Sequence, residues 1–240
     1  MSDVLKTAMD NAATECSLAA PSLFATNSTS SYVQLKRYMN QAAAELLNRH
    51  DWARLTIDGT VTGTGATTYA LASDFHRLVR RDEEHDPAVW SDDMRRAFRP
   101  VQSNGEWTVL QSMGPTPSYG YRIVGDNIEF TQAIASGDTV TYAYVSKKWI
   151  EHSSSGSESW ADDADFTYLP PRLIELGVTW RWKRFRGLEF QSYLGEFEIE
   201  YARATQDDRG LRKISMGSRP RPASPYDGLP VPVLGPDPNA

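Results

Sequence analysis

Four carboxylates gather in one segment, HSSSGSESWADDADF, and are the first candidates for a chemical role: Glu158, Asp162, Asp163 and Asp165. A cell-wall hydrolase could use Glu158 or Asp162 as its acid, but such enzymes pair two carboxyl groups and the sequence identifies no partner for either. The letters DDADF also lack the sixth-position glycine and the terminal glutamate of a calcium-binding loop. Because the segment contains no Lys or Arg, we expect a flexible acidic loop over residues 151–167.

Histidine and cysteine give no further site. A metal needs several convergent ligands, and the four histidines lack such spacing: His50, His76, His85 and His152. Cys16, the single cysteine, falls on an apolar helical stripe, which is typical of a small buried residue rather than a nucleophile. No dinucleotide-binding, phosphate-binding or G-x-S-x-G motif occurs. The sequence therefore predicts no enzyme, no metal and no cofactor.

The composition is that of a folded, water-soluble protein. Hydrophobic residues make up 40% of the 240 residues and aromatic residues 11%, which is enough for a packed core. The net charge of −6 argues against a general nucleic-acid binder. No apolar run approaches the ~20 residues that cross a bilayer, and the first residues lack the features of a secretory signal. We expect synthesis in a cytoplasm and no membrane partner.

Apolar residues recur every three or four positions in four segments, which predicts four amphipathic helices. The first two span about Ser2–Ala19 and Ser31–His50. The third opens at Pro170-Pro171, where proline is tolerated, and ends in a basic cluster before Gly187. The fourth runs from Glu189 to about Ala204. Four such helices suffice for a bundle.

Between the second and third helices the apolar period changes to two, which predicts strands. A strand pair in LTIDGTVTGTGATTYALA is followed by strands at Arg77–Arg81, Arg96–Pro100, Tyr121–Val124, Ile128–Thr131 and Thr139–Ser146. The letters GDN predict a hairpin, and SNGEWTVLQSM a short helix. The predicted fold class is α+β: a four-helix bundle from residues 1–52 and 168–208, an inserted, mostly antiparallel β-domain at 53–150, and an extended proline-rich arm at 209–240.

The arm is the most unusual part of the sequence. Residues 219–240 hold seven of the fourteen prolines, which exclude a helix or a central strand. Residues 203–222 carry six basic and two acidic side chains. A solvated, disordered terminus is one interpretation, and an arm that docks onto another subunit is the other. We favour docking, because proline lowers the entropy cost of ordering and the arm has side chains that could insert into grooves. The candidate docking residues are Leu211, Ile214, Met216, Arg219, Arg221, Tyr226, Leu229, Val231, Val233 and Leu234.

Several short motifs follow one another in an order that resembles a known family. They are Asp51-Trp52, Tyr69-Ala-Leu-Ala-Ser-Asp-Phe75, Arg99-Pro100 and Leu169-Pro-Pro. The order resembles the head-to-tail adaptor (connector) proteins of tailed bacteriophages, including the tail tubular protein A type. The resemblance covers about Ser31 to Ala204 and rests on the order, since no single motif is diagnostic. Ala72 stands where such proteins often have proline.

The resemblance implies a structural protein at the head–tail junction of a virion. Its members form a ring, usually of twelve copies, beneath the portal protein, and a C-terminal extension reaches into the portal. The arm residues would then bind the portal, while a tail nozzle, tube or next connector protein lies below. Twelve copies would together carry about −72, so DNA could pass through an acidic lumen without phosphate contacts holding it. The acidic residues at 158–165 are candidates to face the lumen or the tail, and an ordinary exposed loop is the alternative.

Two alternatives remain at this point. A tail or baseplate protein could bind a receptor or carbohydrate through its β-domain, with exposed tryptophans lining a groove. The candidates for that groove are Trp90, Trp107, Trp149 and Trp160. The cell-wall hydrolase is the other alternative.

Overall fold

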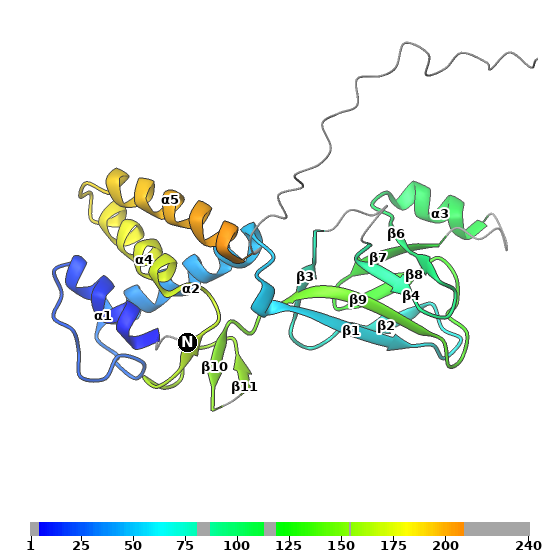
Figure 1. The fold of residues 1–240 in the computed structure, drawn as a ribbon, viewed down its shortest axis with the longest axis horizontal. Coiled ribbons are helices and arrows are strands. Elements are labelled where there is room, and N and C mark those ends of the chain that lie inside the picture. The colour runs from blue at the N-terminus through cyan, green and yellow to red at the C-terminus, as the bar shows by residue number, and fades with distance from the viewer. Residues whose placement is uncertain (1–4, 81–86, 113–118, 154, 209–240) are drawn as a thin grey trace, which may run out of the picture. The chain divides into compact units, whose positions relative to one another are not determined.

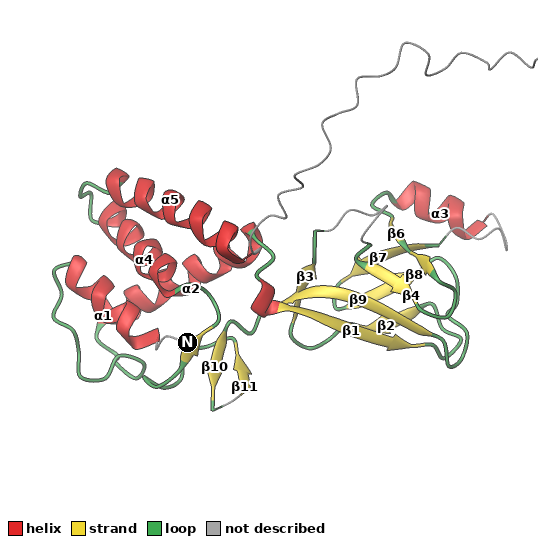
Figure 2. Cartoon of the chain, in the orientation of Figure 1, coloured by secondary structure: helices red, strands yellow, loops and turns green. Residues whose placement is uncertain are grey.

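The structure, a computed structural model, describes residues 5–80, 87–112, 119–153 and 155–208. These residues form a mixed α+β fold with five α-helices and mainly antiparallel sheets (Figures 1 and 2). The helices are α1 (Leu5–Glu15), α2 (Ser30–Arg49), α3 (Asn104–Ser112), α4 (Pro171–Phe185) and α5 (Gln191–Asp208). The predicted candidate residues of the arm lie outside the described residues.

Helix α4 is the centre of the helical part, because α1, α2 and α5 all pack against it. Its apolar stripe, including Leu173 and Leu176, is buried as the helical period predicts. The approach of α2 depends on Gly177, since a Cβ built there would lie 2.7 Å from the Cβ of Ala42. Proline at position 171 starts α4, as expected from the sequence.

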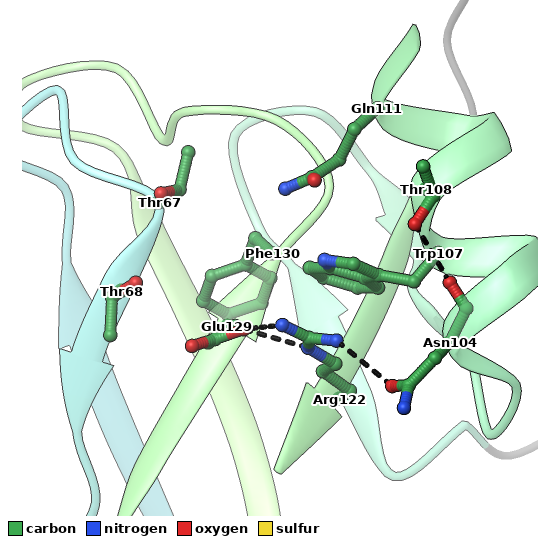
Figure 3. Close-up of a pocket in the computed structure, with 9 residues that line it drawn as sticks. All are labelled: Thr67, Thr68, Asn104, Trp107, Thr108, Gln111, Arg122, Glu129 and Phe130. Carbon is green, nitrogen blue, oxygen red and sulfur yellow. Dashed lines mark hydrogen bonds and ion pairs between the residues drawn. The ribbon is translucent and has the colours of Figure 1, made fainter. Parts of the chain in front are cut away.

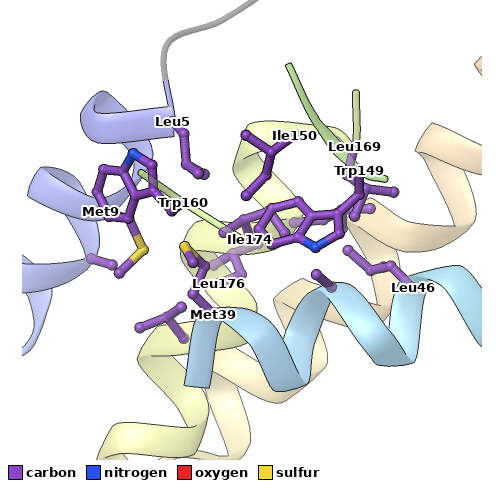
Figure 4. Packing of buried hydrophobic residues seen from close by; sticks show 14 of the residues in the cluster. Leu5, Met9, Met39, Leu46, Trp149, Ile150, Trp160, Leu169, Ile174 and Leu176 are labelled. Carbon is purple, nitrogen blue, oxygen red and sulfur yellow. The ribbon is translucent and has the colours of Figure 1, made fainter. Parts of the chain in front are cut away.

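The four helices α1, α2, α4 and α5 share one hydrophobic core with residues from the segments that follow the sheet. Figure 4 shows the indole rings of Trp149 and Trp160 among side chains of the helices. Both tryptophans are buried, and so are Ile150 and Leu169. The chain that leaves the last long strand therefore completes the helical core.

Twelve short strands of the described residues form three sheets. The largest has the order β1-β9-β4-β5, with β3 also paired to β9; a second has the order β2-β8-β7-β6; the third has the order β11-β10-β12. Only the β6–β7 pair is parallel among these. The strands are β1 (Thr56–Thr62), β2 (Thr68–Ala70), β3 (Phe75–Leu78), β4 (Val89–Ser91), β5 (Arg96–Ala97), β6 (Arg99–Pro100), β7 (Gly120–Val124), β8 (Asn127–Phe130), β9 (Thr139–Ser146), β10 (Ile150–His152), β11 (Ser155–Ser157) and β12 (Phe166–Thr167).

Strand β9 links the two hydrophobic cores of the described chain. Val140, Tyr142 and Tyr144 alternate along it and point into a second core, as side chains on one face of a strand do. Val145, one residue further on, belongs to the helical core instead. The second core also contains Ile128 and Phe130 and holds the two larger sheets together.

The predicted strands and the short helix are present, with differences in detail. The hairpin between β7 and β8 turns at Gly125, which takes a φ of +61°. Strand β4 was not predicted, and Ile57 on β1 is exposed although it is one of the alternating apolar residues of LTIDGTV. The segment 151–167, expected to be a flexible loop, contains the sheet β11-β10-β12. Within the described residues, no helix is long and apolar enough to cross a membrane.

Candidate assembly interface

The predicted acidic residues at 158–165 divide into two that hold the fold together and two at the surface. The carboxylate of Asp163 accepts hydrogen bonds from the backbone N–H of Phe24, at 2.9 and 3.1 Å, and from that of Ala25, at 2.6 Å. Asp163 thereby fastens the segment between α1 and α2 to the segment before α4. Its oxygens are used inside the fold, which argues against a role in lining a lumen.

Asp165 is buried, which the sequence-based expectation of a lumen-facing residue did not anticipate. Its carboxylate lies 2.7 Å from Nδ1 of His152 and accepts hydrogen bonds from the backbone N–H of Ala161, at 3.1 Å, and Asp162, at 3.0 Å. Burial disfavours the charged form, but the hydrogen bonds from these groups outweigh burial and lower the pKa of Asp165. Asp165 is therefore a structural carboxylate.

Glu158 and Asp162 remain at the surface. Glu158 pairs with Lys147 at 3.1 Å, and both side chains are exposed enough for this pair to add little stability. Asp162 accepts a hydrogen bond from the N–H of Ala164 at 2.8 Å. The prediction that these two residues face a lumen or a tail protein stays a prediction.

Trp160 explains why this segment is ordered. Its ring stacks on Phe24 with centroids 5.3 Å apart, and Phe24 in turn meets Tyr32 edge to face. The indole N–H of Trp160 donates to the carbonyl oxygen of Asp162 at 2.6 Å. A stacked aromatic pair adds to the burial of both rings, so the segment is part of the core.

Three of the four tryptophans proposed to line a receptor groove are buried. Trp107, Trp149 and Trp160 have exposed fractions of 4%, 4% and 9%, and only Trp90 is half-buried. The prediction of a receptor groove lined by these four side chains is therefore wrong. Core packing is the commoner role for tryptophan, and it accounts for the three buried rings.

A pocket of about 460 Å³ lies between α3 and the strands β7 and β8 (Figure 3). The guanidinium of Arg122 lies 4.3 Å from the ring centroid of Trp107 and 2.6 Å from the carboxylate of Glu129. It also contacts Asn104 at 3.4 Å. A sugar would need the indole face that Arg122 covers, and the charges of the pocket are already paired. These contacts of Arg122 therefore pack α3 onto the sheet, and we assign the pocket no binding role.

The C-terminal end of α2 is held by Arg77 of β3. The guanidinium donates to the carbonyl oxygen of Leu47, at 2.9 and 3.1 Å, and to that of His50, at 3.1 Å. It also pairs with Asp51 at 2.5 Å. The last carbonyl groups of a helix lack partners within the helix, so a cation placed there satisfies them and complements the helix dipole.

The end of α5 is the last described part of the chain and leads into the arm. Asp208 accepts a hydrogen bond from the N–H of Ala53 and lies 3.0 Å from Nε2 of His50. The His50 side chain is 3% exposed. A carboxylate at a helix C-terminus is unfavourable by itself, and these partners offset that effect. The origin of the arm is thus fastened to the segment between α2 and β1.

A groove of about 310 Å³ lies beside this origin. Its apolar wall comes from the segment before α4, and its acidic wall from α5. The lining residues are Trp52, Arg54, Thr167, Tyr168, Leu169, Pro170, Pro171, Glu200, Ala204, Asp207 and Asp208. Within the described residues, the side chains of Glu200 and Asp207 form no ion pair or hydrogen bond. Sequence patterns did not predict this groove, because its two walls are about thirty residues apart along the chain.

The cysteine and the described histidines, which could act in catalysis elsewhere, are buried or bonded to other residues of the fold. Burial raises the pKa of Cys16 from 9.0 to about 12, which keeps the thiol protonated. His50 and His152 pair with Asp208 and Asp165, and Nε2 of His76 lies 3.1 Å from Asn48. Among the described residues, no group of three His, Cys, Asp or Glu side chains could hold a metal ion. Neither histidine–aspartate pair was foreseen; His50 and Asp208 are far apart in sequence, whereas His152 and Asp165 are 13 residues apart in the segment expected to be a loop.

The described residues form a mixed α+β fold in which many polar groups are bonded within the fold, and a basic, proline-rich sequence follows them. The chain belongs to the SU10 adaptor protein family, whose profile matches residues 5–225. No curated protein matches the chain significantly. The family match confirms the resemblance to phage head-to-tail adaptors and points to a structural protein of the virion that contacts other head and tail proteins.

Proposed function

We propose that the protein is a head-to-tail adaptor that forms a ring between the portal and the tail and conducts DNA. The observation that carries the proposal is the family match over residues 5–225, which spans the described fold and continues into the arm. The ring consists of twelve copies, as in similar connectors. The portal protein lies on one side of it and a tail nozzle, tube or next connector protein on the other.

In this proposal the helices α1, α2, α4 and α5 act as a bundle from which the β-domain at 53–150 projects. Two features support a rigid connection between the helices and the β-domain. Arg77 fastens β3 to the end of α2, and β9 contributes to both hydrophobic cores. A ring that transmits force between capsid and tail needs such connections, because a flexible joint would not fix the position of either partner.

The arm at 209–240 attaches the ring to the portal. Fully extended, these residues could span roughly 100 Å, which is long enough to cross a neighbouring subunit. Their basic and apolar side chains suit a surface with acidic grooves, and their prolines reduce the entropy lost on docking. The arm therefore combines reach with a low cost of ordering.

The lumen of the ring conducts DNA without binding it. Each copy carries a net charge of −6, so the walls repel the phosphate backbone and do not hold it by ion pairs. No enzymatic step is part of this proposal. The virion, at the junction of head and tail, is the proposed location after synthesis in the host cytoplasm.

Electron microscopy of the purified full-length protein mixed with the portal protein of the same phage tests this function. We expect a ring on one face of the portal, with a mass and symmetry that give twelve copies. Particles in which the portal never acquires added density, at protein concentrations of tens of micromolar, would contradict the proposal. A different copy number would change the proposed number of subunits in the ring and leave the adaptor role in place.

A further inference from the structure

The turn between α4 and α5 presents large apolar side chains to solvent. Residues 184–188 are all exposed, and the exposed fractions of Phe185 and Leu188 are 64% and 55%. Within the described residues, Arg184 and Arg186 on either side of Phe185 pair with no carboxylate. Adjacent exposed apolar side chains mark contact surfaces, and arginine is enriched in the cores of protein interfaces.

The backbone holds this turn in one conformation. The N–H of Leu188 donates to the carbonyl of Lys183 at 2.9 Å, and that of Gly187 to the carbonyl of Arg184 at 3.2 Å. With Gly187 at a φ of +68°, these bonds form a Schellman motif, a regular helix ending. In that motif the apolar residue after the glycine usually packs against the helix, but its counterpart here is Lys183, and Leu188 stays exposed. The turn is therefore pre-organised to present its apolar side chains.

A complementary surface exists at the other end of the same two helices. The groove beside the arm's origin has an apolar wall that includes Tyr168, Pro170 and Pro171. Its opposite wall on α5 carries Glu200 and Asp207, which make no ion pair within the described residues. Arg54 and Asp208 also line the groove, but Asp208 is engaged by His50. The groove thus has an apolar wall and, on the wall formed by α5, two carboxylates that are unpaired within the described residues.

We propose that the α4–α5 turn of one copy docks into this groove of the next copy. Phe185 contacts the apolar wall, and Arg184 and Arg186 pair with Glu200 and Asp207. This inference rests on the proposed ring, and it specifies the contact by which neighbouring copies recognise each other.

Geometry favours contact between copies over contact within one copy. Helix α4 separates the turn from the groove by about 20 Å, since its fifteen residues rise about 1.5 Å each. A surface that fits a different surface of an identical molecule makes a head-to-tail contact, which closes into a ring when the rotation between copies allows it. Opposite charges on the two surfaces fix the direction of the ring and disfavour turn-to-turn contact.

Charge reversal tests the contact in the full-length chain, with the number of copies on each portal counted by mass photometry and electron microscopy. We expect the variants R184E/R186E and E200K/D207K each to reduce complete rings at least tenfold. The combined fourfold variant should restore them, because it exchanges the charges. The exposed residues Arg37 and Asp58, reversed as R37E and D58K, are the matched controls and should assemble normally.

The outcomes separate this inference from the proposed function. If the wild-type chain forms no ring on the portal, the proposed function fails. If the wild type and R184E/R186E assemble equally, the turn is not the contact and the inference alone is overturned. The inference would also be overturned if E200K/D207K lost assembly while R184E/R186E assembled normally. That result would assign the groove to the basic arm instead.

Crosslinking gives a second readout that does not depend on charge. The variant carrying L188C and D207C adds one thiol to the turn and one to the rim of the groove, while the native Cys16 is buried. Mild oxidation of assembled rings should give a ladder of disulfide-linked oligomers on non-reducing gels, and each single variant should not. Absence of the ladder from rings that have assembled normally would contradict the contact.

Discussion

The carboxylate of Asp208 and the imidazole of His50 meet at 3.0 Å where α5 ends and the segment after α2 begins. Asp208 also accepts a hydrogen bond from the backbone of Ala53. These contacts join the origin of the arm to the chain that enters the β-sheets.

Replacing Asp208 by Ala should lower the free energy of unfolding by about 1–3 kcal/mol, because it leaves a buried histidine and a backbone N–H without their partner. Urea unfolding followed by circular dichroism measures the change. The matched control is Asp207→Ala, whose side chain is exposed and makes no hydrogen bond or ion pair within the described residues; it should stay within about 0.5 kcal/mol of the wild type. Equal stability of both variants would refute the anchoring role.

Asp165 should make the protein sensitive to acid. Its pKa is lowered in the folded state, so its contribution is fully present above the ordinary carboxyl pKa of about 3.9 and is lost as pH falls through the lower folded value. Asp165→Asn should therefore cost about 1–3 kcal/mol at pH 7. The difference from the wild type should shrink as pH falls below about 4. Asp162→Asn is the control, and a difference that grows as pH falls below about 4 would be inconsistent with this account.

Trp160 should be a major determinant of the helical core. Trp160→Ala removes the stack on Phe24 and should destabilise the protein by about 3–5 kcal/mol, as removal of a buried aromatic side chain does. Trp160→Phe keeps a ring but loses the hydrogen bond to Asp162, so its effect should be smaller. Denaturant titration ranks the three proteins. A loss below about 1 kcal/mol for the alanine variant would mean that this segment is not part of the core.

Helices α2 and α4 were predictable from the sequence because each buries a continuous stripe, whereas α5 buries only Phe197 of the apolar face predicted for it. The repeat of Leu35, Met39 and Leu46 predicted both ends of α2 to within one residue, and Pro171 predicted the start of α4. The strand at 139–146 was also found, since alternating Val140, Tyr142 and Tyr144 all face one core. Local periodicity is sufficient where one element has one buried face.

The segment 151–167 was not predictable in the same way. Serine, glycine and acidic residues are typical of loops, yet the carboxylate of Asp163 is satisfied by groups distant in sequence and that of Asp165 by groups within the segment. Asp163 binds the backbone near residue 24, and that contact carries no local signal. The groove beside α5 depends in the same way on tertiary packing. The division of the chain into domains, and the portal-binding role of residues 211–234, stay predictions.

Assembly of a truncated chain on the portal tests the central claim most directly. A variant that lacks residues 214–240 keeps every described residue, so its circular dichroism and thermal unfolding should match those of the full chain. Mixed with portal particles, it should leave the portal without an added ring in electron micrographs, while the full chain adds one. Normal assembly of the folded, truncated protein would show that the arm is not the attachment and would contradict the account.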